Sequence, residues 1–244
     1  MKYKSIFISD IHLGTSNSLI TPLLNFLKNN EFERIYLIGD IIDLMAIKRK
    51  IKWSNNENLF IQKLLRLSRK GIIIYYIPGN HDSSIHTFNK ENIGNISIQS
   101  KMVINIGKDK ALLVHGDEFD GALKSMVFLY SFGEVIYDYL ILLNPIYLKF
   151  RKLIGIHSDF SLSYYLKNRV KNIMEYLSQY EILMVKKAKM YDCNIVICGH
   201  SHFPESKTIE GIRYFNCGCW TFDSTGSLIV EHLDNRLELI EGIK

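Results

Sequence analysis

The sequence predicts an α/β protein whose central sheet is buried on both faces. Short, almost entirely apolar strands alternate with segments of helical periodicity through the first half of the chain. That alternation is typical of a mostly parallel sheet with helices packed against it. The 244 residues are 47 % hydrophobic and 23 % charged, which is the composition of a folded domain and not of a disordered chain.

Strands and helices alternate over the first eighty residues. The apolar spacing predicts strands over 4–9, 34–38 and 72–77 and helices over 19–27 and 59–67. Gly71 follows the second helix, as expected of a residue that ends a helix. Because 72–77 is apolar throughout and the other two strands are largely apolar, we expect the three strands to lie side by side in the interior.

The pattern changes after residue 100. Residues 101–106 and 110–114 predict a hairpin, with its turn at 107–109. Residues 122–190 have helical character throughout. A strand is expected at 194–198, and short strands are expected at 206–209, 212–216, 227–233 and 236–240.

Composition excludes several classes of protein. A formal net charge of +5 is too small to indicate nucleic-acid binding by itself. The most apolar stretch, 125–148, contains Glu134 and Asp138, so we expect no membrane-spanning helix. The first residues form too short an apolar run for a signal peptide, which favours a cytoplasmic protein. The four cysteines follow no zinc-ribbon spacing and are expected to be reduced and buried.

Polar side chains recur where the predicted strands end. In open α/β sheets ligands bind at this carboxyl edge, so five separate segments are expected to converge there. The side chains with oxygen or imidazole donors are Asp10, His12, Asp40, Asn80, His81, His115, His200 and His202.

These donors are typical of a metal site. Any one of them alone is more often structural, but carboxylates, an amide and imidazoles without a thiolate suit manganese, iron, zinc, nickel or cobalt better than calcium. Setting His81 aside, seven donors exceed the needs of one ion and suffice for two if one carboxylate bridges. A metal pair about 3.5–4 Å apart holds a hydroxide for in-line attack at phosphorus.

Five motifs carry a resemblance to a known family. They are Asp10-Ile11-His12, Gly39-Asp40-x-x-Asp43, Gly79-Asn80-His81-Asp82, His115-Gly116-Asp117 and Gly199-His200-Ser201-His202. In this order they resemble the motifs of the calcineurin-like metallophosphoesterases, over almost the entire chain. The resemblance implies a four-layer αββα sandwich in which residues 1–244 form a single domain with a helical insertion at 121–190.

The resemblance also implies a role for each residue. Asp10, His12, Asp40 and His202 would hold one divalent ion, and Asp40, Asn80, His115 and His200 the other, with Asp40 bridging. Manganese is the first expectation for both ions, with iron, zinc, cobalt and nickel as alternatives. His81 would protonate the leaving oxygen and Asp82 would orient it. Asn80 is also expected to contact the substrate.

Three further stretches narrow the resemblance. Residues 9–14, 115–120 and 216–220 are similar to the UDP-2,3-diacylglucosamine hydrolase group, whose enzymes cleave a pyrophosphate in lipid A synthesis and release UMP. The chain has His81 where the best-known branch has arginine, and it has Cys219 before Trp220, where relatives often have an acidic or a small polar residue. These differences leave open a phosphodiesterase or nucleotide pyrophosphatase with a soluble substrate. A scaffold without catalysis is less favoured, because His81 and all seven donors are present.

The insertion at 121–190 is similar to the lid of that group. Within it, residues 144–174 carry six basic residues against one acidic residue, which equals the net charge of the whole chain. The preceding stretch is apolar on all sides, and an apolar surface beside a basic cluster is typical of contact with a membrane surface. Packed helices with a solvated basic face explain the pattern equally well. Lys167 and Lys171 share a helix face that could meet substrate phosphates, or could be ordinary solvated lysines.

Overall fold

The computed structural model describes residues 1–16, 18–119, 162–221 and 224–243, with the side chains of 162–172 excepted. The chain divides into two compact units, one formed by 1–117 with 184–244 and the other by 118–183. Every described strand belongs to the first unit, as does every residue with a metal-binding donor in the five motifs.

A seven-stranded sheet forms one half of the first unit. Its order is β12–β11–β1–β2–β3–β5–β4. The parallel members are β1 (Lys2–Ile8), β2 (Glu31–Ile38), β3 (Ile73–Ile77) and β5 (Ile96–Ile98). The antiparallel additions are β4 (Asn92–Ile93), β11 (Ser227–Glu231) and β12 (Leu237–Glu241). The parallel strands therefore end at one common edge.

A five-stranded sheet forms the other half, in the order β6–β7–β8–β10–β9. Its parallel centre is β7 (Asp109–Leu113), β8 (Ile195–Cys198) and β10 (Ile212–Asn216). The outer strands β6 (Met102–Ile106) and β9 (Glu205–Ile209) are antiparallel. The pairing of β6 with β7 confirms the hairpin that the sequence predicts.

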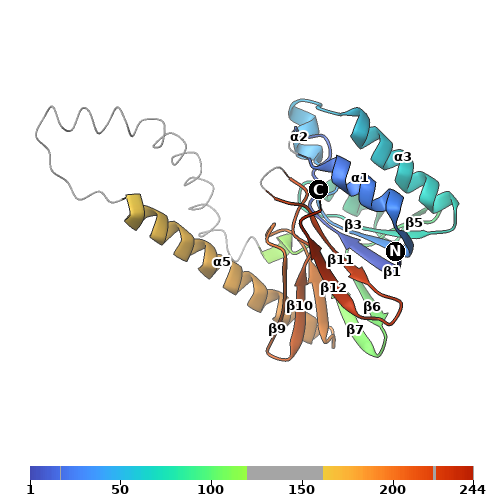
Figure 1. The fold of residues 1–244 in the computed structure, drawn as a ribbon. Helices are drawn as coiled ribbons and strands as arrows, with labels where there is room; N and C mark the ends of the chain where they lie inside the picture. The colour runs from blue at the N-terminus through green and yellow to red at the C-terminus, as the bar shows by residue number, and fades with distance from the viewer. Residues whose placement is uncertain (17, 120–161, 222–223, 244) are drawn as a thin grey trace, which may run out of the picture. The chain divides into compact units, whose positions relative to one another are not determined.

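Three helices lie together on one side of the seven-stranded sheet, α1 (Ile20–Asn29), α2 (Leu44–Arg49) and α3 (Asn55–Arg69) (Figure 1). Helix α3 begins with a capping box, in which Ser54 and Glu57 each bond the other's backbone N–H. Two short 3₁₀ helices, η1 (Ser83–Phe88) and η2 (Asp117–Phe119), follow two of the motifs. Helix α5 (Leu162–Met190) precedes β8.

Alternating side chains of the large sheet build two cores. Ile6 and Leu37 belong to a cluster with the buried residues of α1 and α3. Phe7 and Tyr36 point the other way and pack with Ile197 and other residues of the small sheet. Phe7, Tyr36 and Tyr75 stack across β1, β2 and β3 with ring centroids 4.8 and 4.9 Å apart. The strand period of two thus places one face of the sheet against helices and the other against the second sheet.

The outer face of the small sheet is also buried. Leu112, Val196 and Tyr214 are nearly inaccessible, as are Met184 and Ala188 at the end of α5, which belong to the same unit. The layers of this unit therefore run helix, sheet, sheet, helix, and the expected αββα architecture is confirmed.

The predicted elements agree with the structure apart from their ends. Helix α2 and strands β4 and β5 were not expected, because each is too short to show a period in the sequence. Of the helical stretch expected at 122–190, α5 covers the part from 162 onward, and 120–161 lie outside the described residues. The lid boundaries at 121 and 190 stay a prediction.

Two expectations about composition can be compared with the structure. All four cysteines are free and buried, as expected. Among the residues that the structure describes, no helix combines the length and the apolar character needed to cross a bilayer.

Candidate functional site

Five loops carry the predicted site residues from the carboxyl ends of five strands. β1, β2 and β3 run parallel in one sheet, and β7 and β8 run parallel in the other. The loops after them carry, in chain order, Asp10 and His12, Asp40, Asn80 and His81, His115, and His200 and His202. Parallel pairing collects the donors at one edge of each sheet, and the packing of the two sheets against each other brings the two sets together.

The backbone at this site is held in an uncommon conformation. Asp10, His12, Asp40, His200 and His202 all have φ between 52° and 64°, the left-handed region that non-glycine residues rarely adopt. Two loops are braced against each other by backbone hydrogen bonds, from Asp10 N to Gly39 O at 3.0 Å and from His12 N to Asp40 O at 2.9 Å. Such conformations persist where surrounding structure enforces them, and they cluster at functional sites.

One group of donors consists of Asp10, His12 and His202, with donor atoms within 4.8 Å of one another. Asp10 Oδ1 lies 3.2 Å from His202 Nε2. His12 Nε2 lies 3.4 Å from His202 Nε2 and 4.0 Å from Asp10 Oδ1. Two imidazole nitrogens and a carboxylate oxygen thus face a common point.

A second group consists of Asp40, His115 and His200. Asp40 Oδ2 lies 3.4 Å from His115 Nε2 and 3.9 Å from His12 Nε2 of the first group. One carboxylate oxygen therefore lies between the two groups, which is the position required of a bridging ligand.

Unsatisfied buried oxygens test whether the residues fit metal ions. Asn80 Oδ1 is buried and accepts no hydrogen bond from any described residue, and the buried Asp10 Oδ1 faces only the imidazole nitrogens of His202 and His12. A buried polar atom without a partner is costly, and an ion would satisfy both oxygens. The nitrogen and oxygen donors fit a pair of transition-metal ions. The assignment of individual ligands stays a prediction.

When no ion is bound, protonated imidazoles balance the negative charge of the carboxylates in this cluster. Burial lowers the pKa of His115, but the hydrogen bond with Asp40 and the charges of Asp10 and Asp40 raise it to about 10. Burial likewise lowers the pKa of His202, and hydrogen bonds with Asp10 and Cys219 raise it to about 11. Both imidazoles are therefore cationic at neutral pH and neutralise the carboxylates, a role that a metal ion takes over on binding.

Glycine is required where the loops approach one another most closely. A Cβ at Gly39, whose φ is +78°, would collide with the ring of His115. A Cβ at Gly79 would collide with Asp40 Oδ1 and the His115 ring. The glycines of these two motifs thus make room for the donors.

Asp43 joins the two histidines that face the site. Its Oδ2 lies 2.9 Å from His81 Nδ1 and 3.2 Å from His12 Nδ1, and its Oδ1 accepts from Ala46 N as the N-cap of α2. Burial raises the pKa of Asp43, but the hydrogen bonds from His12, Ala46 and His81 hold it below its usual range. Because an ionised carboxylate only accepts, both Nδ1 atoms donate, and both Nε2 atoms are left for the site.

The prediction that Asp82 orients His81 is wrong. The Asp82 side chain is fully buried and its Oδ2 accepts from Ile41 N at 2.9 Å and Tyr76 Oη at 2.6 Å. Its Oδ1 accepts from Gly79 N at 2.6 Å. Asp82 therefore holds the loops after β2 and β3 together, and Asp43 holds His81. This role of Asp43 could have been predicted from two sequence features, the spacing Gly39-Asp40-x-x-Asp43 and the N-cap position of Asp43.

Lys167 and Lys171 lie in α5, but their side chains fall outside the described residues, so their predicted contact with substrate phosphates is neither supported nor contradicted.

Cys219 is the one cysteine that takes part in the site. It hydrogen-bonds to His202, which helps to hold the pKa of the thiol below its usual value against the effect of burial.

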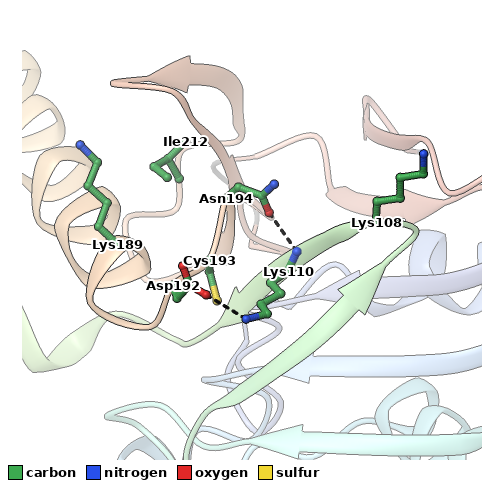
Figure 2. A pocket seen from close by; sticks show the side chains of 7 residues that line it. All are labelled: Lys108, Lys110, Lys189, Asp192, Cys193, Asn194 and Ile212. Carbon is green, nitrogen blue, oxygen red and sulfur yellow. Dashed lines mark hydrogen bonds and ion pairs between the residues drawn. The ribbon is translucent and has the colours of Figure 1, made fainter.

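A hollow of about 450 Å³ lined by Lys108, Lys110 and Lys189 is separate from this site (Figure 2). It lies at the start of β7 and β8, the edge opposite the metal-binding donors. Lys110 Nζ is 2.9 Å from Asp192 and Lys189 Nζ is 2.7 Å from Glu210, so carboxylates already neutralise two of the three lysines.

Comparison with known families identifies the fold and its chemistry. The profile of the family described as Calcineurin-like phosphoesterase matches residues 3–204, which include every donor described above. The chain belongs to this family. Calcineurin-like phosphoesterases are hydrolases that use divalent metal ions, so this chain is a phosphoesterase and its two donor groups are candidates to hold those ions.

Three curated relatives share one name. The chain is 26 % identical to the UDP-2,3-diacylglucosamine hydrolase of Wigglesworthia glossinidia brevipalpis, over 97 % of this chain and 93 % of the relative. The enzyme of that name from Proteus mirabilis is 24 % identical, over 97 % and 98 %. The one from Vibrio atlanticus is 26 % identical, over 88 % and 85 %. The similarity extends over nearly the whole length of this phosphoesterase.

Proposed function

We propose that this phosphoesterase hydrolyses the pyrophosphate of a nucleotide-linked glycolipid. The substrate would be of the UDP-2,3-diacylglucosamine type, and the products would be UMP and the glycolipid phosphate. The main support is the arrangement of two donor groups around Asp40, with His81 held beside them, in a chain similar end to end to relatives of that name.

A pair of divalent ions, with manganese as the first candidate, would supply an activated water and neutralise the phosphoryl oxygens. Asp10, His12 and His202 would hold one ion. Asn80, His115 and His200 would hold the other, and Asp40 would bind both. The short distances from Asp40 Oδ2 to His115 Nε2 and His12 Nε2 support the bridging role.

His81 would protonate the leaving oxygen. Its side chain is 32 % exposed, and its Nε2 lies 4.0 Å from Asp40 Oδ2, on the side of the donor groups. Since Nδ1 donates to Asp43, Nε2 is the nitrogen that can deliver a proton. Water adds at one phosphorus, the bridging P–O bond breaks, and the proton from His81 neutralises the departing phosphate oxygen.

The residues at 121–190 would form a lid that receives the acyl chains. Their apolar stretch and the basic stretch at 144–174 support contact with the lipid and with the cytoplasmic face of a membrane. Lys167 and Lys171 would then meet the substrate's phosphates.

A protein lacking 125–152 should keep two metal ions per chain and should lose activity on acylated substrate much more than on a small aryl phosphodiester.

The identity of residue 81 supports a second candidate substrate. Its position is occupied by arginine in the best-known branch of the glycolipid hydrolases, so a soluble phosphodiester or nucleotide pyrophosphate remains the alternative substrate.

One assay separates the two candidates. The manganese-loaded protein is tested on UDP-2,3-diacylglucosamine in mixed micelles, on a UDP-sugar without acyl chains and on bis(p-nitrophenyl) phosphate, with an Asp40→Asn variant as the inactive control. The proposal expects kcat/KM to be highest, by at least two orders of magnitude, for the acylated substrate. An equal or higher value for the UDP-sugar contradicts it.

A further inference from the structure

A hollow of about 420 Å³ lies in the first unit where helices α1 and α3 begin. Its walls come from the loop after β1 and from the residues that lead into α3. They include Thr15, Ser16, Ser18, Lys52, Trp53 and Asn56. Helices that follow parallel strands begin at the carboxyl edge of the sheet, so this hollow lies on the same edge as the metal-binding donors.

A direct link joins the hollow to the site. Thr15 donates to the carbonyl oxygen of His12, from its amide at 3.3 Å and from its hydroxyl at 2.9 Å. The wall of the hollow therefore begins at Thr15, three residues after the predicted metal ligand His12. A substrate whose phosphate is held at the site can extend its next group into the hollow.

The two sides of the hollow are tied to one buried carboxylate. Glu57 is 2 % exposed, and its Oε1 accepts from Gly14 N at 2.7 Å while its Oε2 accepts from Ser54 N. A Cβ at Gly14 would collide with Ile47 and would lie 3.7 Å from the Trp53 ring. The absence of a side chain at Gly14 thus leaves room for Ile47, and the Trp53 ring lies beside the same loop that leads from His12.

The lining combines one aromatic ring with polar groups. Trp53 is 38 % exposed, whereas the second tryptophan, Trp220, is fully buried. Lys52 Nζ lies 3.3 Å from Ser16 Oγ. Asn56 donates to Thr21 Oγ1 at 2.8 Å, which leaves its own amide oxygen as an acceptor, and Ser18 Oγ makes no hydrogen bond with any described residue.

This chemistry suits a nucleoside better than an acyl chain. A planar base needs an aromatic face to stack on, its edges and the ribose need hydroxyl and amide partners, and its phosphate needs a cation. A volume of about 420 Å³ is within the range of small-molecule pockets. An acyl chain would offer no hydrogen-bond partner to the Asn56 amide oxygen or the Ser18 hydroxyl, and it would remove water from around the Lys52 ammonium group.

We propose that this hollow, the Trp53 pocket, binds the nucleoside half of the substrate. The base stacks on Trp53, and Lys52 lies beside the phosphate of the nucleotide. The inference rests on the proposed function in that it assumes a nucleotide-linked substrate, and it adds where and by which residues that nucleotide is recognised.

Intrinsic fluorescence tests the pocket without measuring catalysis. Because Trp220 is buried, a ligand that stacks on Trp53 should quench the exposed part of the tryptophan emission. UMP and uridine should both quench it saturably, and glucose 1-phosphate and inorganic phosphate should not. Equal quenching by glucose 1-phosphate or phosphate would overturn the proposal, because the signal would then follow a phosphate at the metal site.

Variants sharpen the test, with UMP affinity measured by calorimetry. Trp53→Ala should weaken UMP binding about 5- to 150-fold, as expected for loss of base stacking, and Trp53→Phe should restore most of it. Lys52→Ala should weaken binding of UMP more than of uridine. The matched control is Leu65→Ala, since Leu65 is 47 % exposed on α3 and outside the pocket, and it should bind UMP like the unaltered protein. Unchanged UMP affinity in Trp53→Ala would overturn the proposal.

The results that would contradict the Trp53 pocket differ from those that would contradict the proposed function. If UMP quenches Trp53 but UDP-2,3-diacylglucosamine is not cleaved, the pocket is supported and the glycolipid substrate is rejected. If the glycolipid is cleaved but Trp53→Ala retains both UMP affinity and the kcat/KM preference for the nucleotide-linked substrate over the aryl diester, the pocket is rejected and the function stands.

Discussion

Asp43 accepts a hydrogen bond from His81 at 2.9 Å, and through the same carboxylate oxygen it also accepts from His12. A single side chain thus sets the orientation of a proposed proton donor and of a proposed metal ligand. The carboxylate is itself held as the N-cap of α2. The loop after β2 therefore contributes two carboxylates with different tasks, Asp40 toward the ions and Asp43 behind the imidazoles.

Replacement of Asp43 should affect catalysis and metal binding together. In Asp43→Ala both imidazoles lose the acceptor that sets their tautomer, so we expect activity and metal affinity each to fall about 10- to 100-fold. Steady-state kinetics and titration with manganese measure the two effects. Normal metal affinity in this variant would mean that His12 does not depend on Asp43.

Replacement of His81 should affect catalysis alone. His81→Ala should lower kcat about 10²- to 10⁴-fold at unchanged metal content, because the side chain is proposed to act on the leaving oxygen. Elemental analysis accompanies the kinetics. Loss of one ion per chain would show that His81 is a ligand.

Asp82 should matter for stability more than for chemistry. Its buried carboxylate accepts from Ile41, Tyr76 and Gly79, and Asp82→Asn places a donor opposite one of these donors. We expect the free energy of unfolding to fall by about 1.5–3 kcal/mol, measured by urea denaturation. If stability is unchanged and kcat falls as in His81→Ala, the structural role of Asp82 is refuted.

Asp40 should be the least replaceable of the predicted ligands. Asp40→Asn removes charge from the carboxylate between both donor groups, and it also weakens the hydrogen bond from His81 N to Asp40 Oδ1, which is 2.8 Å long. We expect loss of both ions by elemental analysis and loss of activity. A variant that keeps two ions and near-normal rates would exclude the bridging position.

The metal-free protein should lose stability as the pH rises. His115 and His202 have folded-state pKa values of about 10 and about 11, above the ordinary value of 6.5. Their contribution is complete below pH 6.5 and declines as the pH rises toward these values. Burial lowers the pKa of Lys187 to about 8 and has the opposite effect above that pH.

Denaturation of the EDTA-treated protein between pH 6.5 and 8 therefore follows chiefly the two histidines, against an opposite contribution from the lowered pKa of Cys219. The free energy of unfolding should fall over this range, and less steeply in His202→Asn. Metal affinity should rise with pH over the same range, with protons released on binding. A metal-free protein whose stability is flat or rises from pH 6.5 to 8 contradicts these assignments.

Several features could be predicted from the sequence because each has a local physical signature. The short apolar strands and their alternation with helices along the chain indicated an α/β fold, and polar residues at strand ends indicated where the donors meet. Asp10, His12 and Asp40 could be grouped in advance, because parallel strands of one sheet bring their ends to one edge, whereas His115 follows a strand of the other sheet and joins them through the packing of the two sheets.

Other features depended on contacts between distant segments. Whether Asp43 or Asp82 supports His81 depends on how the loops after β2 and β3 pack together, and both residues have plausible spacing in the sequence. The Trp53 pocket depends on Glu57 tying two loops that lie 40 residues apart in the chain. The sequence by itself determined the fold class and the donor set, because periodicity and strand order are local properties. The tertiary structure alone decided which carboxylate serves which histidine, because hydrogen bonds depend on distances that no local pattern encodes.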